Sequence, residues 1–156
     1  MQRSNLDFLK DLTENNNRAW FTENKSEFEK AKLDFKKLFE QWFESMSTID
    51  ELEALKVFRI YRDVRFSKNK TPYKINFSAS FTRATEALRG GYYFQVQPGN
   101  QSFMAGGFWQ PEAADLKRIR EEIAVDAAPL RKIISSKNFK DHFGEMGGQK
   151  LKSNPR

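Results

Sequence analysis

The apolar positions between Arg18 and Met46 recur at helical spacing and predict one long amphipathic helix. Four aromatic residues within it stand seven positions apart: Phe21, Phe28, Phe35 and Trp42. A straight helix of this length would be about 40–45 Å long, so we expect it to be bent, split near Thr22–Glu23, or shared with a partner chain. The repeat covers little more than three heptads, which favours an aromatic stripe lying on a sheet over a coiled coil. A shorter amphipathic helix is predicted over residues 6–12, and the asparagine-rich run 13–17 separates the two.

Strict alternation replaces helical spacing after Val57. One face of the predicted strand would carry Phe58, Ile60, Arg62, Val64 and Phe66. Residues 75–81 alternate in the same way, which predicts a wide antiparallel hairpin over Val57–Phe81 with Lys68 and Lys70 near its tip. Residues 47–55 before this hairpin have the pattern of a connector with one helical turn at most.

The second half of the chain predicts two more strands and then helices. The strands, Tyr92–Gln97 and Ser102–Trp109, flank the turn residues 98–100. Helices are expected over Pro111–Asp126 and Leu130–Ser136. No segment between strands is long enough for a crossover helix, so the sheet should be antiparallel. The sequence thus predicts a single α+β domain over residues 1–156, with a sheet of four or more strands packed against the long N-terminal helix and against C-terminal helices.

Composition narrows the class of protein. The chain has no cysteine, which excludes disulfides, thiolate metal sites and cysteine nucleophiles. It has neither an apolar run of membrane-spanning length nor the apolar core of a signal peptide, so we expect a cytoplasmic protein without a membrane partner. The basic excess is local, because residues 56–89 hold 9 basic and 2 acidic side chains whereas residues 1–55 hold 8 and 12. A focused basic patch is typical of a site for a compact anion.

The predicted hairpin carries the candidate chemistry. Its candidate ligand-binding residues are Arg59, Arg62, Asp63, Arg65, Lys70 and Tyr73. An arginine presents a planar fork that grips phosphate or carboxylate with two hydrogen bonds. Asp63 is expected to stay ionised beside Arg65 and to orient a guanidinium rather than to shuttle protons. The pattern identifies no catalytic residue, and whether the protein is an enzyme stays open.

Two other interpretations of this basic stretch stay open. In the first, the arginines form a structural salt-bridge lattice with acids of the long helix, among them Glu27, Asp34 and Glu40. In the second, the basic hairpin grips a nucleic-acid backbone while Tyr61 or Tyr73 stacks on bases.

Other candidate sites are weaker. His142 is the only histidine, and no carboxylates stand at metal-ligand spacing from it, so we expect neither a metal nor a cofactor. A magnesium ion held partly by Asp63 is disfavoured by the positive charge around it. Trp20 has the character of a core aromatic residue.

Residues 59–66 have the pattern R-x-x-R-D-x-R-F, and Asn69, Lys70 and Tyr73 follow as N-K-x-x-Y. Together with Phe8-Leu9 and Trp20-Phe21, this pattern resembles the bacterial family called domain of unknown function 2461. The resemblance covers essentially the whole chain and implies a conserved hypothetical protein with a site at the motif. Members of that family continue past a stretch similar to Lys150–Pro155, so we expect part of the C-terminal region to be missing and an apolar face to be exposed near it. The function we expect is binding of a small phosphate- or carboxylate-bearing ligand.

Overall fold

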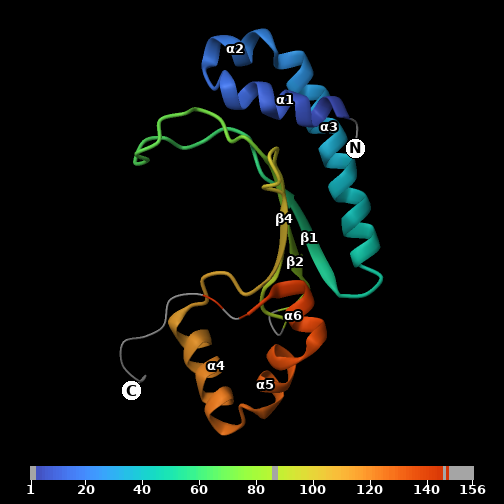
Figure 1. Cartoon of the computed structure of the whole chain (residues 1–156), viewed down its shortest axis with the longest axis vertical. Coiled ribbons are helices and arrows are strands. Elements are labelled where there is room, and N and C mark those ends of the chain that lie inside the picture. Colours follow the sequence, from blue (N-terminus) through green and yellow to red (C-terminus); the bar gives the residue numbers. More distant parts are fainter. Residues whose placement is uncertain (1–2, 86–87, 146, 148–156) are drawn as a thin grey trace. The chain divides into compact units, whose positions relative to one another are not determined.

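The computed structural model describes residues 3–85, 88–145 and 147, and the chain folds into two compact units. The first unit ends at Trp109 and contains the sheet, and the second begins at Gln110 and is helical (Figure 1). Each unit is described by itself.

The sheet has four antiparallel strands in the order β1-β2-β3-β4. They are β1 (Leu52–Val57), β2 (Phe77–Arg83), β3 (Gly91–Val96) and β4 (Phe103–Gly107). Neighbours in the sequence are also neighbours in the sheet, as expected when no crossover helix separates the strands. The predicted α+β class with an antiparallel sheet is therefore confirmed.

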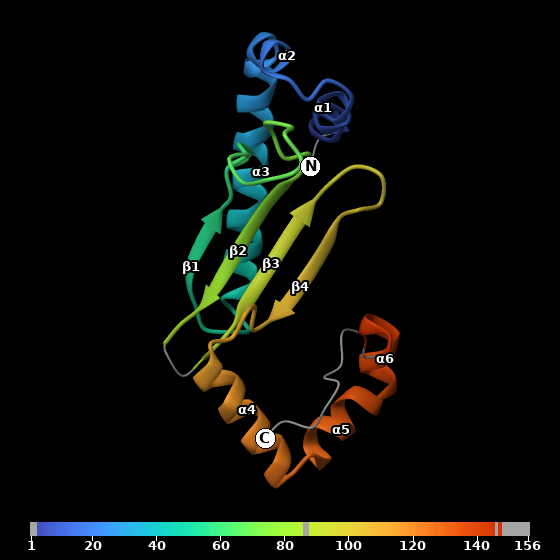
Figure 2. The same ribbon diagram turned by 90° about the vertical axis from the view of Figure 1, so that its left-hand side faces the viewer.

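The predicted long helix is split at Asn24 into α2 (Arg18–Glu23) and α3 (Lys25–Met46). The side chain of Asn17 begins α2 by accepting a hydrogen bond from the Trp20 amide at 3.0 Å. Helix α3 then lies along one face of the sheet (Figure 2). The split lies next to the predicted Thr22–Glu23 position. Because the helix is split, the apolar residues of α3 can pack on the sheet while those of α2 pack near α1.

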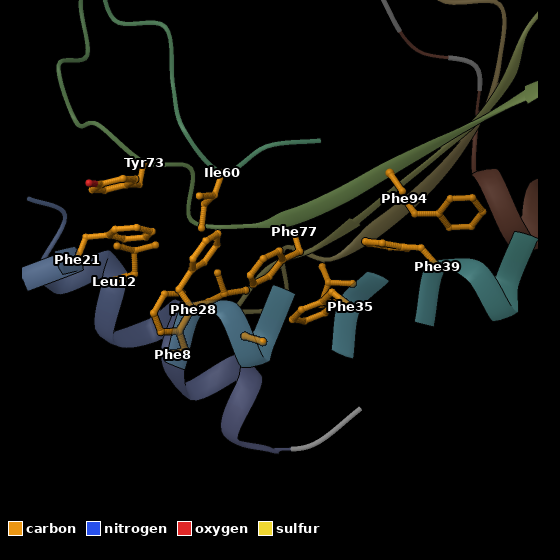
Figure 3. Close-up of a cluster of buried hydrophobic side chains, with 14 of the residues drawn as sticks. Phe8, Leu12, Phe21, Phe28, Phe35, Phe39, Ile60, Tyr73, Phe77 and Phe94 are labelled. Carbon is orange, nitrogen blue, oxygen red and sulfur yellow. The ribbon is translucent and has the colours of Figure 1, made fainter. Parts of the chain in front are cut away.

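The aromatic stripe of α3 packs on the sheet and forms the core, as Figure 3 shows. Phe35 stacks on Phe77 of β2 with ring centroids 4.4 Å apart, and Trp42 lies 5.3 Å from Phe94 of β3. Helix α1 (Arg3–Glu14) closes the other end of α3, where the buried Phe8 ring lies 6.1 Å from Phe28. The interpretation of the seven-residue spacing as a stripe on a sheet is confirmed.

The strand predicted to begin at Val57 is wrong. The first strand ends there, and residues 58–76 form an irregular loop in which the bridge between Tyr61 and Tyr73 is the one strand-like pairing among described residues. Of the predicted apolar face, only Ile60 is buried, while Phe66 is 95% exposed. The strand in residues 52–57 escaped prediction because its register shifts between Leu52 and Ala54, and this bulge hides the alternation.

The second unit contains the helices α4 (Ala113–Val125), α5 (Ala128–Ser135) and α6 (Lys137–Phe143). Pro129 lies in the first turn of α5, and the side chain of Ser136 caps α6 by accepting from the Phe139 amide at 3.2 Å. The two predicted C-terminal helices are thus present, and α6 is additional. Their expected packing on the sheet stays a prediction, and the Lys150–Pro155 stretch lies outside the described residues. In the part of the chain that the structure describes, no helix has the length and apolar character needed to cross a membrane.

Candidate functional site

The loop of residues 58–76, here called the basic loop, is fastened to the N-terminal helices through Tyr73. The side-chain amide of Asn16 donates to the Tyr73 carbonyl at 3.0 Å, and its oxygen accepts from the Tyr73 amide at 3.1 Å. The Tyr73 ring stacks on Phe21 with centroids 3.9 Å apart (Figure 3). Burial, and then the neighbouring Tyr61, raise the pKa of the Tyr73 hydroxyl, which therefore stays protonated. Tyr73 is a buried anchor, so its ring is not available for stacking on a base.

The tip of the basic loop is held by side chains that bond to its own backbone. Asn69 accepts from the amide and the hydroxyl of Thr71 at 2.9 and 2.8 Å. The ammonium of Lys70 donates to the Val64 carbonyl at 2.9 Å and remains exposed. Below the tip, part of the predicted pairing remains, because the Arg62 amide donates to the Pro72 carbonyl at 2.9 Å and the Lys74 amide to the Ile60 carbonyl at 2.7 Å. At the tip the side-chain bonds take over, and they give Lys70 a structural partner.

Asp63 and Arg65 form a local pair on the outside of the loop. The Nε and Nη2 atoms of Arg65 donate to the two carboxylate oxygens of Asp63 at 3.0 and 2.6 Å. Hydrogen bonds from Arg65 lower the pKa of the Asp63 carboxyl, and the nearby Arg59 lowers it further. Asp63 is therefore ionised and fixes the direction of the Arg65 guanidinium, the role expected from the sequence.

Arg62 lies half-buried beneath the tip, where its Nη1 donates to the Thr71 hydroxyl at 3.0 Å. Two of the acids proposed as lattice partners are engaged elsewhere, because Asp34 accepts from Asn5 and Glu40 pairs with Lys36. Across residues 3–85, 88–145 and 147, no carboxylate makes an ion pair with Arg59 or Arg62. The salt-bridge lattice therefore has no support at these two arginines.

Lys74, which sequence reasoning did not select, joins these arginines to the sheet. Its side chain is half-buried, and burial, then Arg59 and Arg62, lower the pKa of its ammonium. The Lys74 ammonium lies 5.4 Å from the centre of the Phe58 ring, and the Lys56 ammonium lies 5.5 Å from the same ring. We call Lys56, Arg59, Arg62 and Lys74 the cation cluster. Among described residues, neither lysine has a carboxylate ion-pair partner.

A signal for both missed lysines was present in the sequence. Lys56 stands between the apolar residues Leu55 and Val57, which is the alternation of a strand. Lys74 belongs to residues 56–89, the segment that carries the local basic excess. What the sequence lacked was the pairing of β1 with β2, in which Lys56 lies opposite Ser80 while the Phe58 amide donates to the Ser78 carbonyl at 2.9 Å. This pairing brings the two lysines to one side of the sheet.

A concavity of about 840 Å³ opens beside Phe58. Its base is formed by small residues of β2, β3 and β4, which leave space above the sheet: Ser80, Gly91, Ala105 and Gly107. The alternation along these strands places them on the face opposite α3, which lies behind the sheet in Figure 2. At Gly91 a Cβ would lie 2.4 Å from the Phe81 carbonyl oxygen, so this position requires glycine. The absence of side chains at the lining glycines thus keeps the hollow open.

Three aromatic rings lie in a row across the same face. Phe58, Tyr93 of β3 and Phe103 of β4 all line the concavity. The ring centroids of Phe58 and Tyr93 are 6.0 Å apart, and those of Tyr93 and Phe103 are 5.6 Å apart. We call these residues the aromatic row. Because Phe58 also contacts both lysines, the row begins at the cation cluster and leads away from it.

A second charged group, at Asp50, was not predicted and is structural. The carboxylate of Asp50 lies 2.7 Å from Nε of Arg83 in β2 and accepts from the Tyr92 hydroxyl of β3 at 2.7 Å. These hydrogen bonds, that of Arg83 foremost, lower the pKa of Asp50. Arg83 also donates from Nη2 to Asp50 at 3.0 Å, so the network ties the turn after α3 to the sheet and is structural.

The remaining candidates lie apart from the cation cluster. His142 is exposed on α6, with Nδ1 2.8 Å from the Asn138 carbonyl oxygen. Trp20 is half-buried, and its ring lies 5.9 Å from that of Phe8, as befits a core residue. Among described residues, no group of three or more histidine or carboxylate side chains is arranged to hold a metal ion.

Comparison with known proteins gives one match. The sequence model of a family described as "Conserved hypothetical protein (DUF2461)" matches residues 4–156, which confirms the resemblance seen in the motif. No curated protein and no solved structure matches the chain.

Proposed function

We propose that this chain, which belongs to the DUF2461 family, binds a small anion bearing a phosphate or carboxylate group at the cation cluster. The observation that carries the proposal is that four cationic side chains gather around Phe58 and Lys74 without a carboxylate ion-pair partner in the described part of the chain. Burial and the nearby Arg59 and Arg62 disfavour the charged form of Lys74, and an anion bound beside it would remove this cost. Asp63 holds Arg65 on the outside of the basic loop, and Lys70 and Tyr73 fix the loop that carries the arginines.

The chemistry of the cluster fits a tetrahedral or planar oxyanion. The guanidinium of Arg59, and the part of Arg62 that does not bond to Thr71, present forked donors, whereas Lys74 presents a compact charge. The half-buried position of Lys74 matters, because screening by salt is weaker there than at an exposed lysine. A bound anion should raise the pKa of the Lys74 ammonium toward its ordinary value, which titration followed by NMR of labelled lysines would detect.

The test is a thermal-shift series with phosphate, sulfate and citrate, set against chloride at equal ionic strength. A ligand at about 100 times its dissociation constant adds about 2.7 kcal/mol to the free energy of unfolding. We expect phosphate to stabilise the chain, and Lys74→Gln or Arg59→Gln to weaken that effect at least tenfold. Lys68→Gln is the matched control, because Lys68 is exposed at the loop tip and lies outside the cluster. Failure of every oxyanion to stabilise the chain more than chloride would overturn the proposal.

A further inference from the structure

The concavity is much larger than a phosphate group requires, and its walls differ at its two ends. One end is lined by Phe58, whose ring centre lies 5.5 Å from the Lys56 ammonium and 5.4 Å from the Lys74 ammonium. The far side is lined by Phe108 and Trp109. The floor between them consists of small side chains, and three rings lie across it. A ligand that matches this surface has an anionic group at one end and a flat, weakly polar body at the other.

We propose that the aromatic row and the cation cluster form one site for a mononucleotide, with the base on the open face of the sheet and the phosphate at the cations. This inference rests on the proposed anion site and names its ligand class. Bases stack on exposed aromatic side chains largely irrespective of sequence, and cations near the same rings hold the phosphate. The contact of Phe58 with both lysines connects the two halves of the site.

Polar groups beside the aromatic row suit the edge of a base. The Tyr93 hydroxyl donates to the amide oxygen of Gln95 at 3.0 Å, and the Gln95 amide nitrogen donates to Gln97 at 3.0 Å. The buried Oδ1 of Asn76, which also bonds to Gln97 through its nitrogen, has no hydrogen-bond partner. Tyr93 lines the concavity, so its hydroxyl oxygen, held in place by Gln95, can accept a hydrogen bond from the edge of a base.

The distribution of charge favours a mononucleotide over a single-stranded nucleic acid. A polynucleotide carries a phosphate at every step, and proteins that bind it place cations along the whole groove. Here the cations adjoin the row at its Phe58 end, and Arg83 on the neighbouring strand is engaged by Asp50. One phosphate-bearing end and one finite hollow therefore match a single nucleotide.

The experiment is titration calorimetry of the whole chain with AMP, UMP, inorganic phosphate, pyrophosphate and a dodecameric oligonucleotide. The variants are Phe103→Ala, which removes a half-exposed ring, and Ala105→Leu, which fills the hollow at an exposed position. Phe66→Ala is the control, since Phe66 is exposed outside the hollow, and thermal melting without ligand checks that each variant folds.

We expect AMP or UMP to bind at least tenfold more tightly than inorganic phosphate. Phe103→Ala and Ala105→Leu should each weaken the nucleotide about tenfold and leave phosphate unchanged, whereas Lys74→Gln should weaken both. Nucleotides that bind no more tightly than phosphate or pyrophosphate, or that bind equally to the Phe103 and Ala105 variants, would overturn the nucleotide site and leave the anion site standing. An oligonucleotide that binds tenfold more tightly than either mononucleotide would overturn it in favour of nucleic acid. Absence of binding by every anion would overturn both proposals.

Discussion

At the scale of single residues, Asn16 decides the shape of the candidate site. Its side chain bonds to both backbone groups of Tyr73, so it supplies for the basic loop what a neighbouring strand would supply in a sheet. This bond pair supports a loop whose own pairing is short, with one bridge between Tyr61 and Tyr73 and a backbone hydrogen bond on each side of it.

We predict that Asn16→Ala lowers the free energy of unfolding by about 1–3 kcal/mol, since two part-buried hydrogen bonds are lost together. Asn16→Asp should also destabilise, because a carboxylate accepts from the Tyr73 amide but has no proton for the Tyr73 carbonyl. Denaturant unfolding measures both effects. Asn15→Ala is the control, because the Asn15 side chain bonds to Asp11 of the preceding helix, and a cost equal to that of Asn16→Ala would contradict the role given to Asn16.

At the scale of elements, the contact of α3 with the sheet holds the first unit together. Phe28, Phe35 and Phe39 are all buried between helix and strands. Two of their rings stack on Phe77, at 6.2 and 4.4 Å. Helix α3 therefore covers one face of the sheet, and the opposite face carries the aromatic row.

We predict that Phe35→Ala lowers the free energy of unfolding by about 3–5 kcal/mol, because the cavity at a site only 1% exposed has no solvent to fill it. Leu33→Ala on the same helix is the matched control, since its side chain is 52% exposed and should cost about 0.5 kcal/mol or less. Equal costs in chemical denaturation would show that α3 does not pack on the sheet as described.

At the scale of the molecule, some charged side chains form structural ion pairs, and others form the cation cluster. Asp50 ties the turn after α3 to β2 and β3, and Asp63 holds Arg65 in the basic loop. Both carboxyl groups have a pKa below the usual value of 3.8, with hydrogen bonds from arginine as the largest cause. The cluster, by contrast, contains cations without an ion-pair partner among described residues, which is what a binding site for an anion requires.

These lowered pKa values set the direction of the pH dependence. A carboxyl whose pKa is lower in the folded chain contributes stability above its unfolded pKa, and loses it as pH falls through the folded pKa. We therefore predict that the melting temperature declines below about pH 4. Asp50→Asn should lower stability at neutral pH and flatten this decline, whereas Asp63→Asn should do so less because its pair is local and exposed. An unchanged acid slope in Asp50→Asn would contradict the assignment.

Much of the fold and part of the site followed from the sequence alone. Helical spacing from Arg18 to Met46 and the turn residues between β3 and β4 are local signals, so the α+β class and the antiparallel sheet could be predicted. The motif of residues 59–66 likewise pointed to the basic loop and to the DUF2461 family. Asp63 and Arg65 are two residues apart, and their pairing is also local.

Only the tertiary structure decided which cations meet. The bulge in β1 shifts the register, residues 58–76 leave the sheet as a loop, and the bond between Asn16 and Tyr73 joins positions 57 residues apart. Strand pairing then brings Lys56 and Lys74 to the Phe58 ring, and Lys74 also lies near Arg59 and Arg62. Long-range pairing depends on the packing of the whole unit, whereas periodicity depends on neighbours in the chain. For this reason the position of the basic loop could be predicted from the sequence, whereas the residues that form the cation cluster could be identified only from the tertiary structure.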